Sequence, residues 1–235
     1  MAATTPATTD LHPLPSVAAY WVKNNVLAAI LAGIMSVCVY GVRQMTGAAD
    51  GSAGSGAIAV LQVAAIVIWG LWGAASGVLT GAVLQRIIPR LPVWAWIALH
   101  AAGAAIVGVG LEMLLLSVPR DPGGVDDTSL FATLLLGLVT GAILGAVTGA
   151  AEALVLRRVA TGTAIWVACS ALGYAASWSF LVVSSNLLGL GTDFASELAS
   201  DVLGVIGTFL MALIMLPALK RLRSAGLSAA ARHFN

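Results

Sequence analysis

Charged side chains are scarce in this sequence. Asp, Glu, Lys and Arg make up only 9% of its 235 residues, and the formal net charge is +1. A soluble domain carries about 25% charged residues, and a disordered chain is charged and poor in apolar residues. Here 60% of the residues are hydrophobic, and the mean hydropathy is +0.99. The composition therefore excludes a soluble domain, a disordered chain and a basic nucleic-acid-binding surface, and it leaves a multi-pass membrane protein.

The residue types that carry most catalytic and metal chemistry are also rare. The sequence has two cysteines and three histidines. It contains no glycine-rich phosphate loop followed by Lys-Ser/Thr, no His-Glu-x-x-His motif and no cluster of Cys and His ligands. Its serines have no accompanying His and Asp motif that would activate a nucleophile. We therefore predict no enzyme activity, no catalytic residue and no metal site, and no cofactor is favoured.

Long apolar stretches, in contrast, fill most of the chain. A helix needs roughly 20 apolar residues to cross a hydrocarbon core of about 30 Å. None of the stretches of this length shows the alternation of barrel strands, so we predict an all-α integral membrane protein with about six transmembrane helices. The expected spans are residues 25–42, 57–85, 93–118, 129–156, 163–189 and 202–219. An N-terminal tail would cover residues 1–24, the membrane domain 25–219, and a basic tail 220–235.

The basic residues predict the orientation of these spans. They precede the first span and follow the second, fourth and sixth, and only Arg43 and Arg120 fall on the opposite side. By the positive-inside rule, both termini are expected to be cytoplasmic. The first span is longer than the apolar core of a signal peptide, so we expect it to be retained, although Gly47-Ala48-Ala49 resembles a cleavage site.

Aromatic residues cluster at the predicted cytoplasmic helix starts. Amphipathic rings favour the level of the lipid headgroups, so we expect them to act as interface anchors. Stacking on a ligand is the alternative. The residues concerned are Tyr20, Trp21, Trp94, Trp96 and Trp166.

Two segments of the sequence resemble each other. Thr80 and Arg90 recur as Thr148 and Arg158 at a spacing of 68 residues, together with several Gly and Ala positions. Trp96 recurs as Trp166 if two extra residues are allowed. We predict a parallel repeat of helical hairpins, with one copy at about 57–118 and the other at about 129–189, because two helices separate equivalent positions.

Glycines at four-residue spacing mark one face of two predicted helices. Such a row has no side chains and lets another helix approach closely. The simplest expectation is that helices 57–85 and 129–156 pack against each other along these faces, around a pseudo-twofold axis. Alternatively, these glycine faces would dock another subunit or a flat cofactor. The helix-packing glycines are Gly73, Gly77 and Gly81, and Gly137, Gly141, Gly145 and Gly149.

The segment Thr148-Gly-Ala-Ala-Glu-Ala-Leu-Val-Leu-Arg-Arg158, followed by Trp166 and Ala171-Leu-Gly-Tyr-Ala175, resembles a loose group of uncharacterised bacterial multi-pass membrane proteins. Those proteins have repeated glycine-zipper hairpins that end in Gln-x3-Leu and an arginine pair. In one copy, Glu152 stands at the position of this Gln. In the other copy, the glutamine is displaced to Gln85. The resemblance implies a bacterial cytoplasmic (inner) membrane, and it implies no activity.

Ionisable residues inside a bilayer are costly and are functional candidates. We expect two polar levels, His100–Glu152–Gln85 toward the cytoplasm and Gln62–Glu112–Asn186 toward the outside. Glu112, Glu152 and Gln62 are the candidates for an ion or proton pathway, together with His100.

Each of these residues also has a structural interpretation. Glu152 would form an ion pair with Arg157 and Arg158 at the interface, and Glu112 would be protonated or hydrogen-bonded to Gln62 as interhelical glue. His100 would be a hydrogen-bonded packing residue, or else a haem or chlorin ligand.

Three functions follow from these features. The leading hypothesis is a non-catalytic scaffold or accessory subunit of a membrane complex, which acts through the glycine-lined faces. The second is a small transporter or channel that uses Glu112, Glu152 or His100. The third is a pigment- or haem-binding subunit through His100. The expected partners are the lipid bilayer and other membrane subunits or a second copy of the chain, with no nucleic acid.

Overall fold

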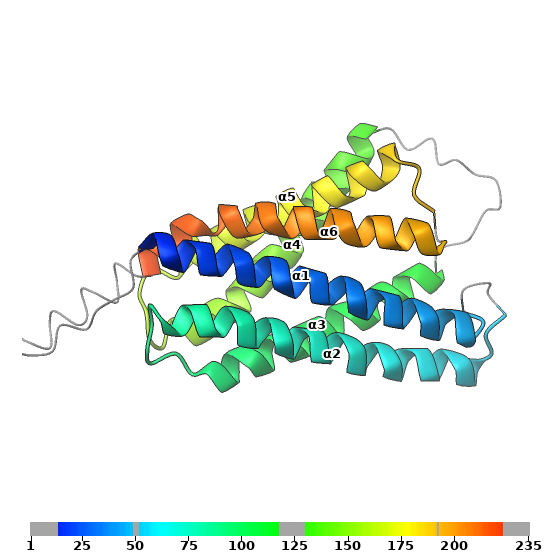
Figure 1. Cartoon of the computed structure of the whole chain (residues 1–235), viewed down its shortest axis with the longest axis horizontal. Coiled ribbons are helices and arrows are strands. Elements are labelled where there is room, and N and C mark those ends of the chain that lie inside the picture. Colours follow the sequence, from blue (N-terminus) through cyan, green and yellow to red (C-terminus); the bar gives the residue numbers. More distant parts are fainter. Residues whose placement is uncertain (1–13, 49–51, 118–129, 192, 223–235) are drawn as a thin grey trace, which may run out of the picture.

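The computed structural model describes residues 14–48, 52–117, 130–191 and 193–222, and these residues form a bundle of long helices (Figure 1). All six are long and apolar enough to cross a membrane, which confirms the predicted all-α membrane fold. The helices are α1 (Leu14–Met45), α2 (Ser55–Gln85), α3 (Val93–Ser117), α4 (Leu130–Leu156), α5 (Ala164–Leu187) and α6 (Phe194–Ile214).

Two helices begin earlier than the sequence predicted. The N-terminal tail was expected to reach residue 24, but α1 begins at Leu14, and its first turns bury Val17 and Trp21 in the core. The sixth span was expected from residue 202, whereas α6 begins at Phe194. Helix ends follow capping and packing as well as hydropathy, and this explains both differences.

The start of α6 is fixed by a side-chain cap. The Asp193 carboxylate accepts hydrogen bonds from the backbone N–H groups of Ala195 and Ser196 at 3.0 and 3.1 Å, and from the Ser196 hydroxyl at 2.6 Å. These bonds, above all that from the Ser196 hydroxyl, lower the pKa of Asp193 below its usual 3.8. The cap thus favours the ionised carboxylate at the N-terminus of a helix, where the helix dipole also favours it.

We expect Asp193→Ala to lower the unfolding temperature of the detergent-solubilised protein. Because the folded-state pKa is lowered, the stabilisation is present above pH 3.8 and is lost as the pH falls through the lowered value. Asp193→Asn is the matched control, since Asn also caps a helix and does not titrate. Equal unfolding temperatures for Asp193→Ala and the wild type at pH 7 would contradict the cap.

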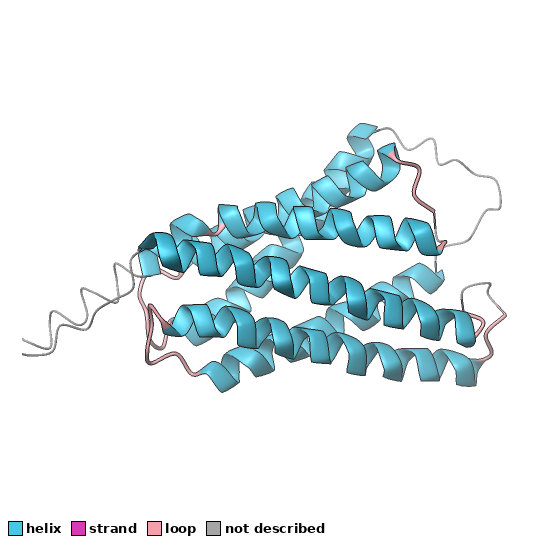
Figure 2. Cartoon of the chain, in the orientation of Figure 1, coloured by secondary structure: helices cyan, strands magenta, loops and turns pink. Residues whose placement is uncertain are grey.

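The helices run alternately up and down, and each packs against its neighbours in the chain. The hairpins α2–α3 and α4–α5 make the most extensive contacts, α1 packs on both α2 and α6, and α3 touches α4 least. The short loops 86–92 and 157–163 lie at the same end of the bundle as the start of α1 and the helical segment that follows α6 (Figure 2). We call this end the basic end, because Lys23, Arg86, Arg158 and Arg221 all lie on segments that reach it.

The hydrophobic core is concentrated at the basic end. Trp96, Trp166, Leu84 and Leu156 are at most 1% exposed and belong to one cluster, to which α1 and the residues after α6 also contribute. The second described cluster is smaller and joins α1 to α2 near the opposite end, around Val39 and Leu61. The bundle is therefore held together mainly at one end, and α4 and α5 diverge from α2 and α3 toward the other (Figure 1).

Three of the expected interface anchors are core residues instead. Trp21, Trp96 and Trp166 are 3%, 0% and 1% exposed. Their rings form edge-to-face contacts, with Trp166 at 5.7 Å from Trp21 and at 6.0 Å from Trp96 between centroids. Trp94, in contrast, is 76% exposed. Positions 94 and 96 point to opposite sides of α3, so only one of them can reach lipid.

The glycine rows pack within each hairpin, so the expected packing of α2 against α4 is wrong. A Cβ atom at Gly77 would lie 2.8 Å from the Ile97 Cα on α3, and one at Gly145 would lie 2.8 Å from the Ala171 Cα on α5. Gly73 and Gly81 also face α3, and Gly137, Gly141 and Gly149 face α5. The short loops hold each pair of helices as antiparallel neighbours, so each row meets its own hairpin partner. These faces are therefore covered and cannot dock a subunit or a flat cofactor.

We expect Gly77→Ala and Gly145→Ala to destabilise the protein by about 1–3 kcal/mol each, because the added methyl group meets backbone atoms that cannot move aside. Gly103→Ala on α3 is the control, since nothing lies within 4 Å of the position of its Cβ. There alanine should be neutral or stabilising by up to about 1 kcal/mol. Unfolding in a denaturing detergent measures all three variants, and equal midpoints would contradict the close packing.

Candidate functional site

A buried polar contact joins the two hairpins near the basic end. His100 on α3 and Glu152 on α4 face each other, with His100 Nε2 at 3.1 Å from Glu152 Oε1. Trp166 on α5 donates its indole N–H to Glu152 Oε2 at 2.7 Å. Glu152 is only 7% exposed, so both of its oxygens have protein partners in a nearly dry environment. The predicted inner polar level is therefore correct for His100 and Glu152.

The hydrogen bonds of His100 define where its protons can be. His100 Nδ1 lies 3.0 Å from the Trp96 carbonyl oxygen. A carbonyl oxygen only accepts, so Nδ1 carries a hydrogen. The contact with Glu152 then contains one proton, either on Nε2 beside a carboxylate or on the carboxylic acid beside a neutral ring. His100 and Glu152 therefore form a single coupled proton-binding unit.

The same network extends to α2. Trp96 donates its indole N–H to Thr80 Oγ1 at 3.0 Å, and Thr80 in turn donates to the Ser76 carbonyl at 2.8 Å. Trp96 and Trp166, which the predicted repeat makes equivalent, thus each donate to a polar side chain on the preceding helix of their own hairpin. The four central helices are connected through these side chains.

A second buried pair lies toward the opposite end of the bundle. Arg43 on α1 donates to Glu112 on α3 through Nη2, at 2.8 Å from Oε2. Arg43 is 9% exposed and Glu112 is 2% exposed. The Arg43 Nε atom is buried and has no hydrogen-bond partner among the described residues. From the sequence, Arg43 was expected outside the spans, but α1 continues to Met45 and keeps this side chain on the helix.

The other predicted contacts are wrong. Gln62 donates to the Met113 sulfur at 3.0 Å, and Glu112 bonds to Arg43 in its place. Glu152 bonds to His100 and Trp166 and does not pair with the arginines that follow α4. Gln85 and Asn186 are exposed and belong to neither level. Hydropathy gave the depth of these residues, whereas their partners depend on the rotation of each helix.

One polar contact was not predicted from the sequence. The Ser36 hydroxyl on α1 donates to Glu197 Oε1 on α6 at 2.8 Å, and Asp201 lies one turn further along α6, against Gly33 of α1. Both acidic residues were expected in the loop between the fifth and sixth spans, outside either helix. The capping pattern that begins at Asp193 was the signal that would have placed them on a helix.

His100 is poorly suited to hold a haem or chlorin. Both of its ring nitrogens have hydrogen-bond partners, so Nε2 would have to leave Glu152 in order to bind a metal. Among the described residues, no group of three His, Cys, Asp or Glu side chains is arranged to hold a metal ion.

No protein-family model matches the chain, and neither a curated protein nor a solved structure is significantly similar to it. The functional argument therefore depends on the geometry of the two buried pairs.

Proposed function

We propose that this protein is a small transporter or channel that conducts protons across the bacterial cytoplasmic membrane, with both termini on the cytoplasmic side. His100 and Glu152 would form its proton-binding unit. The observation that carries the proposal is the buried contact of 3.1 Å between His100 Nε2 and Glu152 Oε1, which joins the two hairpins. The orientation rests on the basic loops, which lie at one end of the bundle.

Because of where the His100–Glu152 pair lies, a change in its protonation would alter the contact between the two hairpins. The pair joins α3 to α4, the neighbouring helices that touch least. A second proton would leave a positive imidazolium beside a neutral acid, and loss of the shared proton would leave a buried carboxylate beside a neutral ring. Either change removes the charge balance of the contact and weakens the connection between the hairpins. Movement of one repeat relative to the other is how many transporters expose a site to alternate sides.

The accessory-subunit hypothesis is the second candidate, but it loses its original basis. The glycine faces that were expected to dock a partner are covered within the hairpins. A different observation favours it: Arg43 and Glu112 neutralise each other, and both Glu152 oxygens have partners, as in a static bundle. In that case the buried pairs would only fix which helices are neighbours.

Proton flux distinguishes the two functions. The purified protein is reconstituted into vesicles that contain a pH-sensitive dye, and a potassium gradient with valinomycin imposes a membrane potential. We expect the vesicles to change internal pH faster than protein-free vesicles, and the Glu152→Gln variant to abolish the difference. If the wild-type protein gives no flux above protein-free vesicles, the transport proposal is wrong and the accessory-subunit function takes its place.

A further inference from the structure

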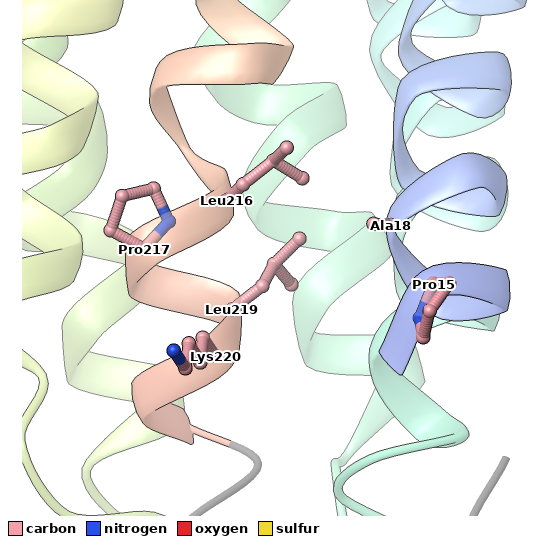
Figure 3. Close-up of a pocket in the computed structure, with 6 residues that line it drawn as sticks. All are labelled: Pro15, Ala18, Leu216, Pro217, Leu219 and Lys220. Carbon is pink, nitrogen blue, oxygen red and sulfur yellow. The ribbon is translucent and has the colours of Figure 1, made fainter. Parts of the chain in front are cut away.

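A groove opens between the first and last helical segments at the basic end. It has a volume of about 490 Å³, within the size range of small-ligand sites. Leu216 and Leu219 point toward Ala18 and Pro15 at the start of α1 (Figure 3). Pro217 and Lys220 complete the lining. The groove is therefore apolar along its length and carries an ammonium group.

The groove lies beside an interruption in the last helix. α6 ends at Ile214, and a short helix resumes over residues 216–222. Pro217 has no N–H group to donate to the carbonyl of Leu213, so the regular helical ladder cannot continue through this point. The resumed helix brings Leu219 into the core, where it is 1% exposed, and leaves Lys220 exposed at the end of the bundle.

The charge around the groove indicates the occupant. Exposed basic side chains gather at this end, and they include Lys23, Arg157, Lys220 and Arg221. An apolar groove between membrane helices with basic groups at its end matches an acyl chain with an anionic headgroup. A compact ammonium such as that of Lys220 also suits a phosphate.

We propose that the α1–α6 groove binds one phospholipid with an anionic headgroup. Its acyl chain lies along Ala18, Leu216 and Leu219, and its phosphate lies at Lys220. The site is separate from His100 and Glu152 and does not depend on the proposed transport function.

Native mass spectrometry of the whole protein in a mild detergent tests the site, with phosphatidylglycerol as the probe and phosphatidylcholine as the comparison. We expect a single phosphatidylglycerol to bind in preference to phosphatidylcholine. Lys220→Gln should weaken that binding about fivefold, which corresponds to the attraction of one basic residue for an anionic lipid. Lys23→Gln is the matched control, because Lys23 is exposed at the same end and does not line the groove.

A second variant tests the apolar part of the site. Ala18→Leu fills the groove and should remove the bound lipid, while the melting temperature of the lipid-free protein reports whether the fold is intact. Equal binding of the two lipids, or equal affinities of Lys220→Gln and Lys23→Gln for phosphatidylglycerol, would overturn the proposal. A lipid-free dimer that Ala18→Leu dissociates would also overturn it, because a second copy would then occupy the groove.

Discussion

Glu152→Gln is expected to abolish proton flux while the protein folds as the wild type does. The substituted glutamine side chain has the same shape as glutamate, so its oxygen can still accept the indole N–H of Trp166. Its amide group can donate to Nε2 of a neutral His100, whose Nδ1 hydrogen stays on the Trp96 carbonyl. Both hydrogen bonds of Glu152 are thus kept, but an amide cannot gain or lose a proton as the carboxyl group does, so the proton shared between the two side chains is lost.

Two comparisons separate a functional pair from a structural one. Glu152→Ala leaves the Trp166 indole and His100 Nε2 without partners, so it should cost about 1–3 kcal/mol for each buried group. Glu197→Gln is the control for flux, because Glu197 bonds to Ser36 at a different place in the bundle. Wild-type flux in Glu152→Gln vesicles would exclude the pair as the proton site, even if Glu152→Ala fails to fold.

The largest loss of stability is expected when Arg43 loses its partner. Glu112→Ala would leave a buried guanidinium with no counter-charge, since Arg43 Nη2 bonds to Glu112 and Arg43 Nε already has no partner among the described residues. Breaking a buried ion pair in this way costs about 3–5 kcal/mol. Unfolding in a denaturing detergent measures the change, and the midpoint should fall accordingly.

The double variant Arg43→Met with Glu112→Leu supplies the control. Replacing both charges by apolar groups of similar volume is often neutral or stabilising, so the double variant should recover most of the loss. Gln62→Leu tests the alternative pairing predicted from the sequence, and it should have a small effect because the side-chain hydrogen bond that Gln62 makes among the described residues is to the Met113 sulfur, a weak acceptor. If Gln62→Leu is as destabilising as Glu112→Ala, the ion pair with Arg43 is not the main stabilising contact of Glu112, and the prediction is wrong.

The sequence alone was sufficient to predict the spanning architecture. A bilayer core excludes unpaired backbone groups and most charges, so length and hydropathy are enough to predict six helices. The depth of a residue follows from its place along a helix, and the sequence therefore predicted His100 and Glu152 at one level. The repeat, the orientation and the resemblance to bacterial membrane proteins stay predictions.

Only the tertiary structure decided which side chains meet. Trp94 faces outward and Trp96 lies in the core, although they are two residues apart, and Arg43 turns inward to Glu112. The glycine rows meet their own hairpin partners. These helices are apolar on nearly all sides, so hydropathy along the chain gives little information on the rotation of each helix about its axis. That rotation is set by packing between helices that are distant in the sequence, such as α1 on α6.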